Sequence, residues 1–464
     1  MREIISISGS HRTNHVLTQF YNCQEELLHD VNGQNEPEVF LSPVVDKISN
    51  TVSYSPRALL WDAKGGAGSL GSHEYESSHD YYFDPARKPD EATQEGVQVI
   101  QTHGRVPKSD YQKAIDSNGT LPKLDDTNTR YWSDYSKLVF ESSNLNSLRD
   151  WYHNVEDPSL PDFQNLHQTY FSSYEVGYHV FKNDYSTDFF DEKLHPQLES
   201  CDGLQGINLL SEIDKGWGGF TSSLLLEMRD ELPKTDILTW GFSEDDALSL
   251  GQPIRSTKTK FELICNKIRS TLSLVRDSNL FFPLYSDPQQ SLWRSAGASN
   301  LLFDAVISTA SNRLAENRSL FRQTVGMLTQ GESRRNIVSE LNVDSLDFSF
   351  YSRIPRIKTT GTKTYTRVAI TRDPECIVDE PWMLKTYKWQ PSDTIPSDYK
   401  QNTTYTASLA VTEKPRDVFK NWFGLVSRYF RYDSDREELK EELGTLASEY
   451  EEGWYDDDES GDDF

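Results

Sequence analysis

The chain has 464 residues, 36% of them hydrophobic, and a formal net charge of −26. This length predicts two or three domains with buried cores. The negative charge argues against a nucleic-acid binder, which needs basic patches, and against electrostatic docking on anionic lipid. No apolar run approaches the ~20 residues that cross a bilayer.

The four cysteines are far apart in the sequence and form no CxxC pair of the kind used in zinc or redox sites. Such usage predicts a reducing, intracellular setting. The start of the chain, MREIISISGS, alternates like a strand and lacks the arginine-rich pattern of an organelle presequence. A protein of this kind is expected to act at an organelle only from its cytosolic face.

The first 71 residues predict two buried strands, over residues 3–8 and 57–63, with a helix over residues 14–28 between them. Residues 72–130 are polar and form an insertion with one short strand at 97–102. From Tyr131 on, the sequence again predicts folded structure. Helices are then predicted over residues 166–181, 204–213 and 220–232, followed by a strand over residues 236–242. Strands that alternate with helices predict an α/β fold with a parallel sheet covered on both faces.

The second half mixes the two element types less regularly. Its apolar periodicity predicts helices over residues 261–274, 301–313 and 320–328, and strands over residues 346–351 and 364–371. Two terminal helices follow, over residues 418–430 and 436–450. The expected domain limits are therefore 1–71 with 131–250, the insertion 72–130, an α+β domain 251–415, C-terminal helices 416–450 and a tail 451–464.

The tail holds eight acidic residues among 14 and no basic residue. A solvated segment that aids solubility is the favoured interpretation. The alternative is a docking tail for a basic partner.

Common catalytic motifs are absent from the sequence. GAGSLG at residues 66–71 fits the GxGxxG pattern, but no helical periodicity follows it, so a loop is favoured over a dinucleotide site. His11 and His15 are four residues apart, yet no HExxH is present and no acid is placed to complete a metal site. Surface or capping roles are expected for these histidines, and no metal site is predicted.

A glycine-rich turn joins the predicted helix 204–213 to the next one and reads DKGWGGF, residues 214–220. A helix that begins at glycines offers free N–H groups and a positive dipole end to a phosphate. Asp214 would repel that anion by ~1–4 kcal/mol at contact range. Trp217 and Phe220 would fill the space it needs. The residue types therefore favour a closed core over a nucleotide site.

Several segments resemble tubulin. ESCDGLQGINLL at residues 199–210 and EMRDELP at 227–233 resemble the segments on either side of the tubulin phosphate loop, and YSPRALLWD at 54–62 resembles a tubulin strand. WSDY at 132–135, DAKG at 62–65 and TWGF at 239–242 are typical of the narrower Misato family. The resemblance implies a tubulin-like fold and a role in mitochondrial distribution and inheritance of mitochondrial DNA.

The resemblance also identifies the positions that would hold a nucleotide if one is bound. In the first loop these are Ser10, His11, Arg12 and Asn14, of which only Asn14 matches tubulin and Arg12 offers a guanidinium to a phosphate. In the phosphate loop, tubulin's GGGTGSG, they are the four positions Gly216, Trp217, Gly218 and Gly219.

These departures predict a non-enzymatic tubulin-like protein with no cofactor, since GTP is doubtful at so altered a loop. It is expected on the cytosolic face of mitochondria, with a cytoplasmic pool, bound through protein partners at the mitochondrial surface or the cytoskeleton. The sequence leaves two alternatives open. One is a GTP-binding, filament-forming tubulin homologue, and the other is an assembly factor that works with tubulin or a chaperonin.

Overall fold

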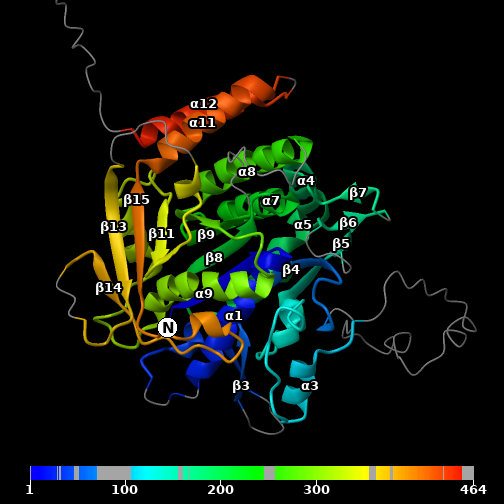
Figure 1. Ribbon diagram of the computed structural model, residues 1–464, viewed down its shortest axis with the longest axis vertical. Coiled ribbons are helices and arrows are strands. Elements are labelled where there is room, and N and C mark those ends of the chain that lie inside the picture. The colour runs from blue at the N-terminus through cyan, green and yellow to red at the C-terminus, as the bar shows by residue number, and fades with distance from the viewer. Residues whose placement is uncertain are drawn as a thin grey trace, which may run out of the picture.

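The computed structural model describes residues 2–28, 30, 33–45, 52–70, 106–154, 160–165, 167–244, 257–354, 362–376, 380–431 and 433–451 (Figure 1). The predicted strand at 97–102 and nearly all of the acidic tail lie outside these ranges. Among the helices within them, none is long and apolar enough to span a membrane.

An eight-stranded sheet forms the centre of the N-terminal half. Its strands lie in the order β10 (Leu280–Tyr285), β9 (Asp236–Ser243), β8 (Leu204–Glu212), β1 (Glu3–Gly9), β4 (Ala58–Lys64), β5 (Leu145–Tyr152), β6 (Phe163–Gln164) and β7 (Thr169–Tyr170). The six strands from β10 to β5 are parallel, and β6 and β7 are antiparallel additions at one edge. Every residue of β1 is buried, as a central parallel strand requires.

Helices cover both faces of this sheet. On one face α1 (His11–Leu28) packs against α9 (Leu292–Ser308), and on the other α7 (Gly216–Glu231) packs against α4 (Tyr174–Asp184) and α8 (Thr257–Asp277) (Figure 1). Shorter helices are α3 (Asp110–Asp116), α5 (Ser186–Asp188), α6 (His195–Glu199) and α10 (Phe321–Thr329). Single turns lie at 37–39, 132–135, 142–144, 189–194, 309–311, 351–353 and 397–399. The predicted α/β class, with a parallel sheet covered by helices on both faces, is confirmed.

A second sheet has the strand order β12 (Leu346–Asp347), β11 (Glu340–Val343), β15 (Thr406–Thr412), β13 (Thr364–Thr371) and β14 (Met383–Lys385). A separate hairpin pairs β2 (Leu41–Val45) with β3 (Val52–Pro56). The C-terminal helices α11 (Lys414–Tyr429) and α12 (Arg436–Glu449) pack on each other, and α12 also contacts α8. This half matches the expected α+β arrangement followed by helices.

A buried ion pair joins the two halves. Arg372, which follows β13, donates from Nη2 to Asp304 of α9 at 2.7 Å, and Gln24 of α1 donates to the other oxygen of Asp304 at 3.1 Å. The Arg372 side chain is completely buried. Three segments that are far apart in the sequence are therefore held by one carboxylate.

The helix predicted over residues 204–213 is wrong, because this segment is the strand β8. Its last seven residues are buried in an unbroken run between β1 and β9. A short apolar run without alternation fits a buried strand and a buried helix equally well, and only its sheet partners decide.

Several other helices and strands begin or end at residues other than those predicted, because caps and turns set the ends of these elements. The helix predicted from residue 166 begins at Tyr174, where the Ser173 hydroxyl accepts a hydrogen bond from the N–H of Val176. The helix predicted over 301–313 begins at Leu292, with Ser291 as its cap, and ends at Ser308. The strand predicted over 346–351 has only two residues before the chain turns into a short helix at 351–353.

The second part of the predicted insertion is folded onto the body. The helix α3 begins after Ser109, whose hydroxyl donates to the carbonyl of Asp134 at 2.6 Å. Tyr111 packs beside Tyr135 and Trp293, and its hydroxyl donates to Asp393 at 2.9 Å. Residues 106–130 therefore belong to the folded unit.

Candidate functional site

The predicted site residues lie where parallel strands end. Because β1, β4 and β8 run in the same direction, the segments that follow them meet at one edge of the sheet, which is where ligands bind in open α/β sheets. The loops after β1 and β8 contain residues 10–14 and 213–219, and residues 62–66 include the last residues of β4 and the turn after it. The structure thus brings both predicted loops together.

Protein atoms close the start of α7. The N–H of Gly216 donates to the carbonyl of Phe171 at 3.2 Å. A Cβ built on Gly218 would lie 2.1 Å from the Ser270 hydroxyl, and one built on Gly219 would lie 1.9 Å from the carbonyl oxygen of Tyr174. The glycines that would face a phosphate if a nucleotide were bound are therefore pressed against neighbouring protein atoms.

The two aromatic residues of this turn are core residues, as their chemistry predicted. Trp217 is 2% exposed and Phe220 is fully buried. The Trp217 ring lies 5.1 Å from the Phe171 ring, and its Nε1–H donates to Asp162 Oδ2 at 3.0 Å. The Phe220 ring meets the Phe181 ring edge-on at 5.1 Å. This packing accounts for both side chains without a ligand.

Asp214 is held by partners of its own. Its carboxylate accepts from the Ser243 hydroxyl at 2.9 Å and from the N–H of Glu244 at 2.7 Å, and it lies 3.4 Å from the Lys267 ammonium. The predicted negative charge is therefore present at the start of α7 and fixed in position.

Arg12 points at carboxylates. Its Nε–H donates to Glu212 at 2.8 Å, and its Nη2 pairs with Glu244. Burial disfavours the charge on Arg12, but the two glutamates more than offset burial and raise the pKa of the guanidinium. Nη1 has no hydrogen-bond partner among the described residues.

The side chains of Ser10 and Asn14 in the first loop form hydrogen bonds within the protein. The Ser10 hydroxyl accepts from the N–H of Thr13 at 3.2 Å and so caps α1, which begins three residues earlier than predicted. Asn14 donates to the carbonyl of Trp61 at 3.0 Å and to Asp62 at 3.1 Å.

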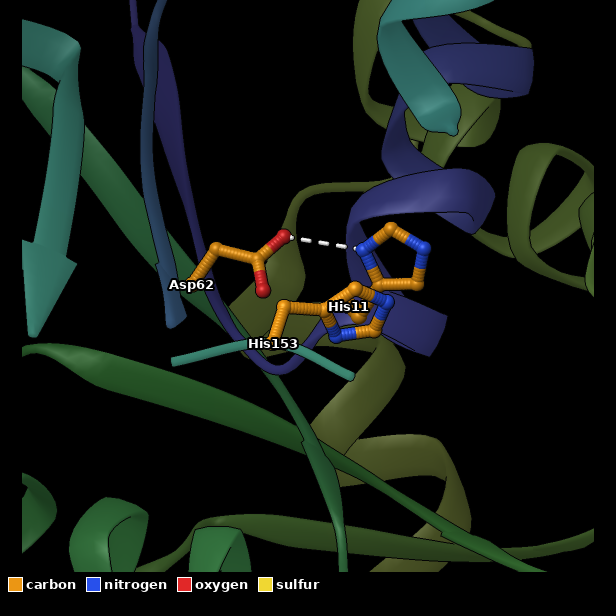
Figure 2. Close-up of side chains that lie close together, drawn as sticks. All are labelled: His11, Asp62 and His153. Carbon is orange, nitrogen blue, oxygen red and sulfur yellow. Dashed lines mark hydrogen bonds and ion pairs between the residues drawn. The ribbon is translucent and has the colours of Figure 1, made fainter. Parts of the chain in front are cut away.

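His11 and His15 are buried, so the surface or capping roles expected for them are wrong. His11 Nδ1–H donates to Asp62 Oδ2 at 3.0 Å, and His153 lies beside the same pair with its ring centroid 4.3 Å from that of His11 (Figure 2). An acid is therefore placed beside the histidines, contrary to the prediction. It is 51 positions away in the sequence and was brought there by the pairing of β1 with β4.

The electrostatics of this cluster differ from one histidine to the next. Burial lowers the pKa of His11, but the Asp62 carboxylate more than offsets burial and raises it above its ordinary value. Burial, together with the nearby His11 and Arg12, lowers the pKa of His15 well below its ordinary value. His15 is therefore neutral in the folded protein at physiological pH.

The GAGSLG segment begins as a turn that covers Asp62, as far as the described residues extend. Gly66 lies against the Asp62 carboxylate, and Gly68 has a φ of +56° beneath Tyr131. Residues 65–69 are turns, and the described part of the motif ends at Leu70. Within residues 65–69 the chain has no helix start of the kind that a dinucleotide site requires.

His153 and Asp162 are site residues that could not be predicted without the strand β5, which the sequence did not indicate. His153 directly follows that strand, and its Nδ1–H donates to Asp162 Oδ1 at 3.1 Å. The usable signal was LNSLRDWY, in which apolar residues alternate only in part. Recognition of β5 as a neighbour of β4 would have placed His153 beside Asp62.

Comparison with known proteins finds two family matches, both within residues 2–314. Residues 2–117 match the Misato Segment II tubulin-like domain, and residues 121–314 match a tubulin domain. The chain is 51% identical to protein DML1 of Kluyveromyces lactis, with 99% of each chain covered. It is 42% identical to protein DML1 of Eremothecium gossypii over the whole of both chains.

A tubulin-like sheet, the matched segments and relatives aligned from end to end agree with one another. The chain belongs to the Misato family of tubulin-like proteins, and to its fungal members that carry the name DML1.

Proposed function

We propose that this tubulin-like protein neither binds nor hydrolyses GTP, and that it acts in the partitioning of mitochondria and the inheritance of mitochondrial DNA. The observation that carries the first part is the packing of Trp217, whose ring is buried at the start of α7 and whose Nε1–H is held by Asp162. A phosphate on this helix would have to displace that side chain.

The charges around the two loops support the same conclusion. Glu212, Glu244 and Asp214 surround Arg12 and Lys267 and neutralise them. Phosphoryl transfer depends on preorganised cationic and N–H contacts to the phosphate oxygens. Cations already paired with carboxylates supply little of that stabilisation.

The mitochondrial part of the proposal rests on the resemblance to the Misato family. We place the protein at the cytosolic face of mitochondria, with a cytoplasmic pool. The net charge of −26 is repelled by anionic headgroups, which supports attachment through a protein partner at the mitochondrial surface or the cytoskeleton.

A titration with a fluorescent GTP analogue tests the first part. The purified full-length chain is expected to give no saturable signal below about 1 mM nucleotide, an affinity weaker than about −4 kcal/mol. Saturable binding that Arg12→Ala abolishes would contradict the proposal.

Depletion of the protein in cells tests the second part. Daughter cells are expected to receive clumped or missing mitochondria and to lose mitochondrial DNA over successive divisions. In isolated mitochondria, added protease is expected to degrade the bound protein while matrix markers survive. Normal inheritance after complete depletion would contradict the role, and protection from protease would contradict the location.

One observation favours a second candidate, a GTP-binding tubulin homologue that forms filaments. Arg12 lies in the loop that corresponds to a phosphate-contacting loop of tubulins, and its Nη1 has no partner among the described residues. Pelleting of filaments in the presence of GTP, and not in its absence, would support this candidate.

A further inference from the structure

Two histidines and an aspartate meet in the interior beside the first loop. His11 is the first residue of α1, Asp62 lies on β4, and His153 follows β5 (Figure 2). One ligand atom from each of the three side chains lies within 4.8 Å of the other two. The three residues are at most 6% exposed. A buried convergence of these residue types is the usual form of a metal site.

His153 is oriented for a metal ligand. Its Nδ1–H donates to Asp162 Oδ1, so the lone pair of the neutral ring is on Nε2. That Nε2 is buried and has no hydrogen-bond partner among the described residues. Metal-binding histidines have this arrangement, in which a carboxylate holds one ring nitrogen and the other is free for the ion. Asp162 is itself fixed by the Trp217 Nε1–H at 3.0 Å.

Both ring nitrogens of His11 also have a neighbouring side chain that fixes the orientation of the ring. Its Nδ1 faces Asp62, and its Nε2 lies 3.3 Å from Nε2 of His15. Nδ1 of His15 lies 2.7 Å from the Tyr135 hydroxyl. With a lone pair on His11 Nδ1, the Nε2–H of His11 donates to His15 and the Nδ1–H of His15 donates to Tyr135. Every remaining nitrogen of the two rings then has a partner.

Asp62 supplies the negative ligand. Oδ2 accepts from Trp132 Nε1 at 3.1 Å and from Asn14 at 3.1 Å, and Oδ1 accepts from the N–H of Ala63 at 2.9 Å. These three donors hold both oxygens of the Asp62 carboxylate in place. Calcium and magnesium require all-oxygen sites, whereas two imidazoles with one carboxylate suit a first-row transition metal.

We propose that His11, His153 and Asp62 bind one divalent transition-metal ion, and that Zn²⁺ is the ion that fits best. Tetrahedral ligands at zinc distances are about 3.3 Å apart, so the three donors need to move by no more than about 1.5 Å to enclose it. Zinc has no geometric preference from its d electrons, which suits a site assembled from a helix start, a strand and a loop.

Such an ion adds a direct link between segments that the sheet already brings close together. It ties the residues after β5 to the start of α1, and through Asp162 it reaches Trp217 at the start of α7. The rival interpretation is a simple ion pair of His11 with Asp62, which leaves Nε2 of His153 without a role.

Metal analysis of the full-length purified protein tests the proposal. We expect about one Zn²⁺ per chain, loss of that zinc and a lower Tm after dialysis against a chelator, and recovery of the Tm when Zn²⁺ alone is added back. With a water molecule as the fourth ligand, Co²⁺ in place of Zn²⁺ is expected to give the visible absorption of a four-coordinate site.

His153→Asn is the most informative variant, because the asparagine amide retains a donor near the Nδ1 position for Asp162 and lacks the ligand nitrogen. It is expected to lower zinc content at least tenfold, as is Asp62→Asn. His195→Asn is the matched control at a half-exposed position and is expected to retain the full content. Wild-type protein without zinc and without a Zn²⁺-dependent Tm would overturn the proposal, as would full zinc content in folded His153→Asn.

Discussion

Gly177 of α4 lies so close to Gly216 of α7 that a Cβ built on Gly177 would be 1.7 Å from the carbonyl oxygen of Gly216. The reverse contact is equally close, because Gly219 of α7 faces the carbonyl oxygen of Tyr174. The two helices cross with their backbones in contact. The glycines of the altered phosphate loop thus have a packing role that involves no ligand.

Gly177→Ala is expected to destabilise the protein by roughly 2–4 kcal/mol, because backbone atoms of α7 cannot move aside as a flexible side chain would. Gly219→Ala is expected to cost a similar amount. The midpoint of urea unfolding measures both.

Gly326→Ala is the control, since Gly326 lies in α10 and nothing lies within 4 Å of the Cβ position. Here the substitution is expected to raise stability by about 0.5–1 kcal/mol, as alanine favours a helix interior. Wild-type stability in Gly177→Ala would show that the helices cross less closely than described.

Arg372→Met is expected to cost roughly 3–5 kcal/mol, because it leaves the Asp304 carboxylate buried without its cation. Arg367→Met, on the strand β13 that Arg372 directly follows, is the matched control. Arg367 is 55% exposed and lies 3.6 Å from Glu340, and the loss of such a surface pair costs about 0–1 kcal/mol. Equal costs for the two variants by urea unfolding would contradict the assignment of Arg372 as the buried link.

The buried carboxyl of Asp134 is expected to make the stability of the folded protein depend on pH. Burial raises the pKa of its carboxyl to about 6, although the Tyr131 N–H, His11 and Arg130 act in the opposite direction. A raised pKa means that the folded state holds the proton more tightly than the unfolded chain. The stability contributed by protonation is complete below the unfolded pKa of about 3.9 and is lost as the pH rises through about 6.

Asp134→Asn is therefore expected to stabilise the protein by roughly 1–2 kcal/mol above about pH 7, with a gain that shrinks toward about pH 4. Urea unfolding at both ends of this range measures it. A gain that stays the same across the range would rule out the proton linkage.

Removal of residues 452–464 is expected to leave the Tm nearly unchanged. The segment is mostly acidic, so its charges repel one another and it has little apolar surface to bury. Glu451 is kept because it pairs with Lys420. A fall of several degrees in a thermal scan would show that the segment packs on the body.

The sequence predicted elements well where a cap or a clear period marked them. The strand over residues 364–371 has the predicted limits, and the terminal helices are shifted by only a few residues. The prediction was wrong at β8, because only the order of strands in the sheet decides whether this unbroken apolar run is a strand or a helix. The sequence also did not predict β5, where apolar residues alternate only in part, or β10, a short apolar run that contains Pro283.

The residues of the candidate site also fall into two groups, those that local chemistry identified and those that only the fold brings together. Local chemistry identified Asp214, Trp217 and Phe220 as unfavourable for a phosphate, and the structure places the two aromatics in the core. The cluster of His11, Asp62 and His153 was beyond local reasoning. Its members are separated by 51 and 91 positions, from 11 to 62 and from 62 to 153, and only the sheet brings them together.

The burial of α1 has a consequence for synthesis on the ribosome. Gln19 donates to the carbonyl of Thr394, and Asn22 donates to its hydroxyl, so this helix finds some of its polar partners about 370 residues later. At about 5–20 residues per second, the partners emerge roughly 20–75 s after the helix. During that time the nascent N-terminus has polar and apolar groups without their final contacts, which makes the chain a natural client for chaperones that shield unfinished domains.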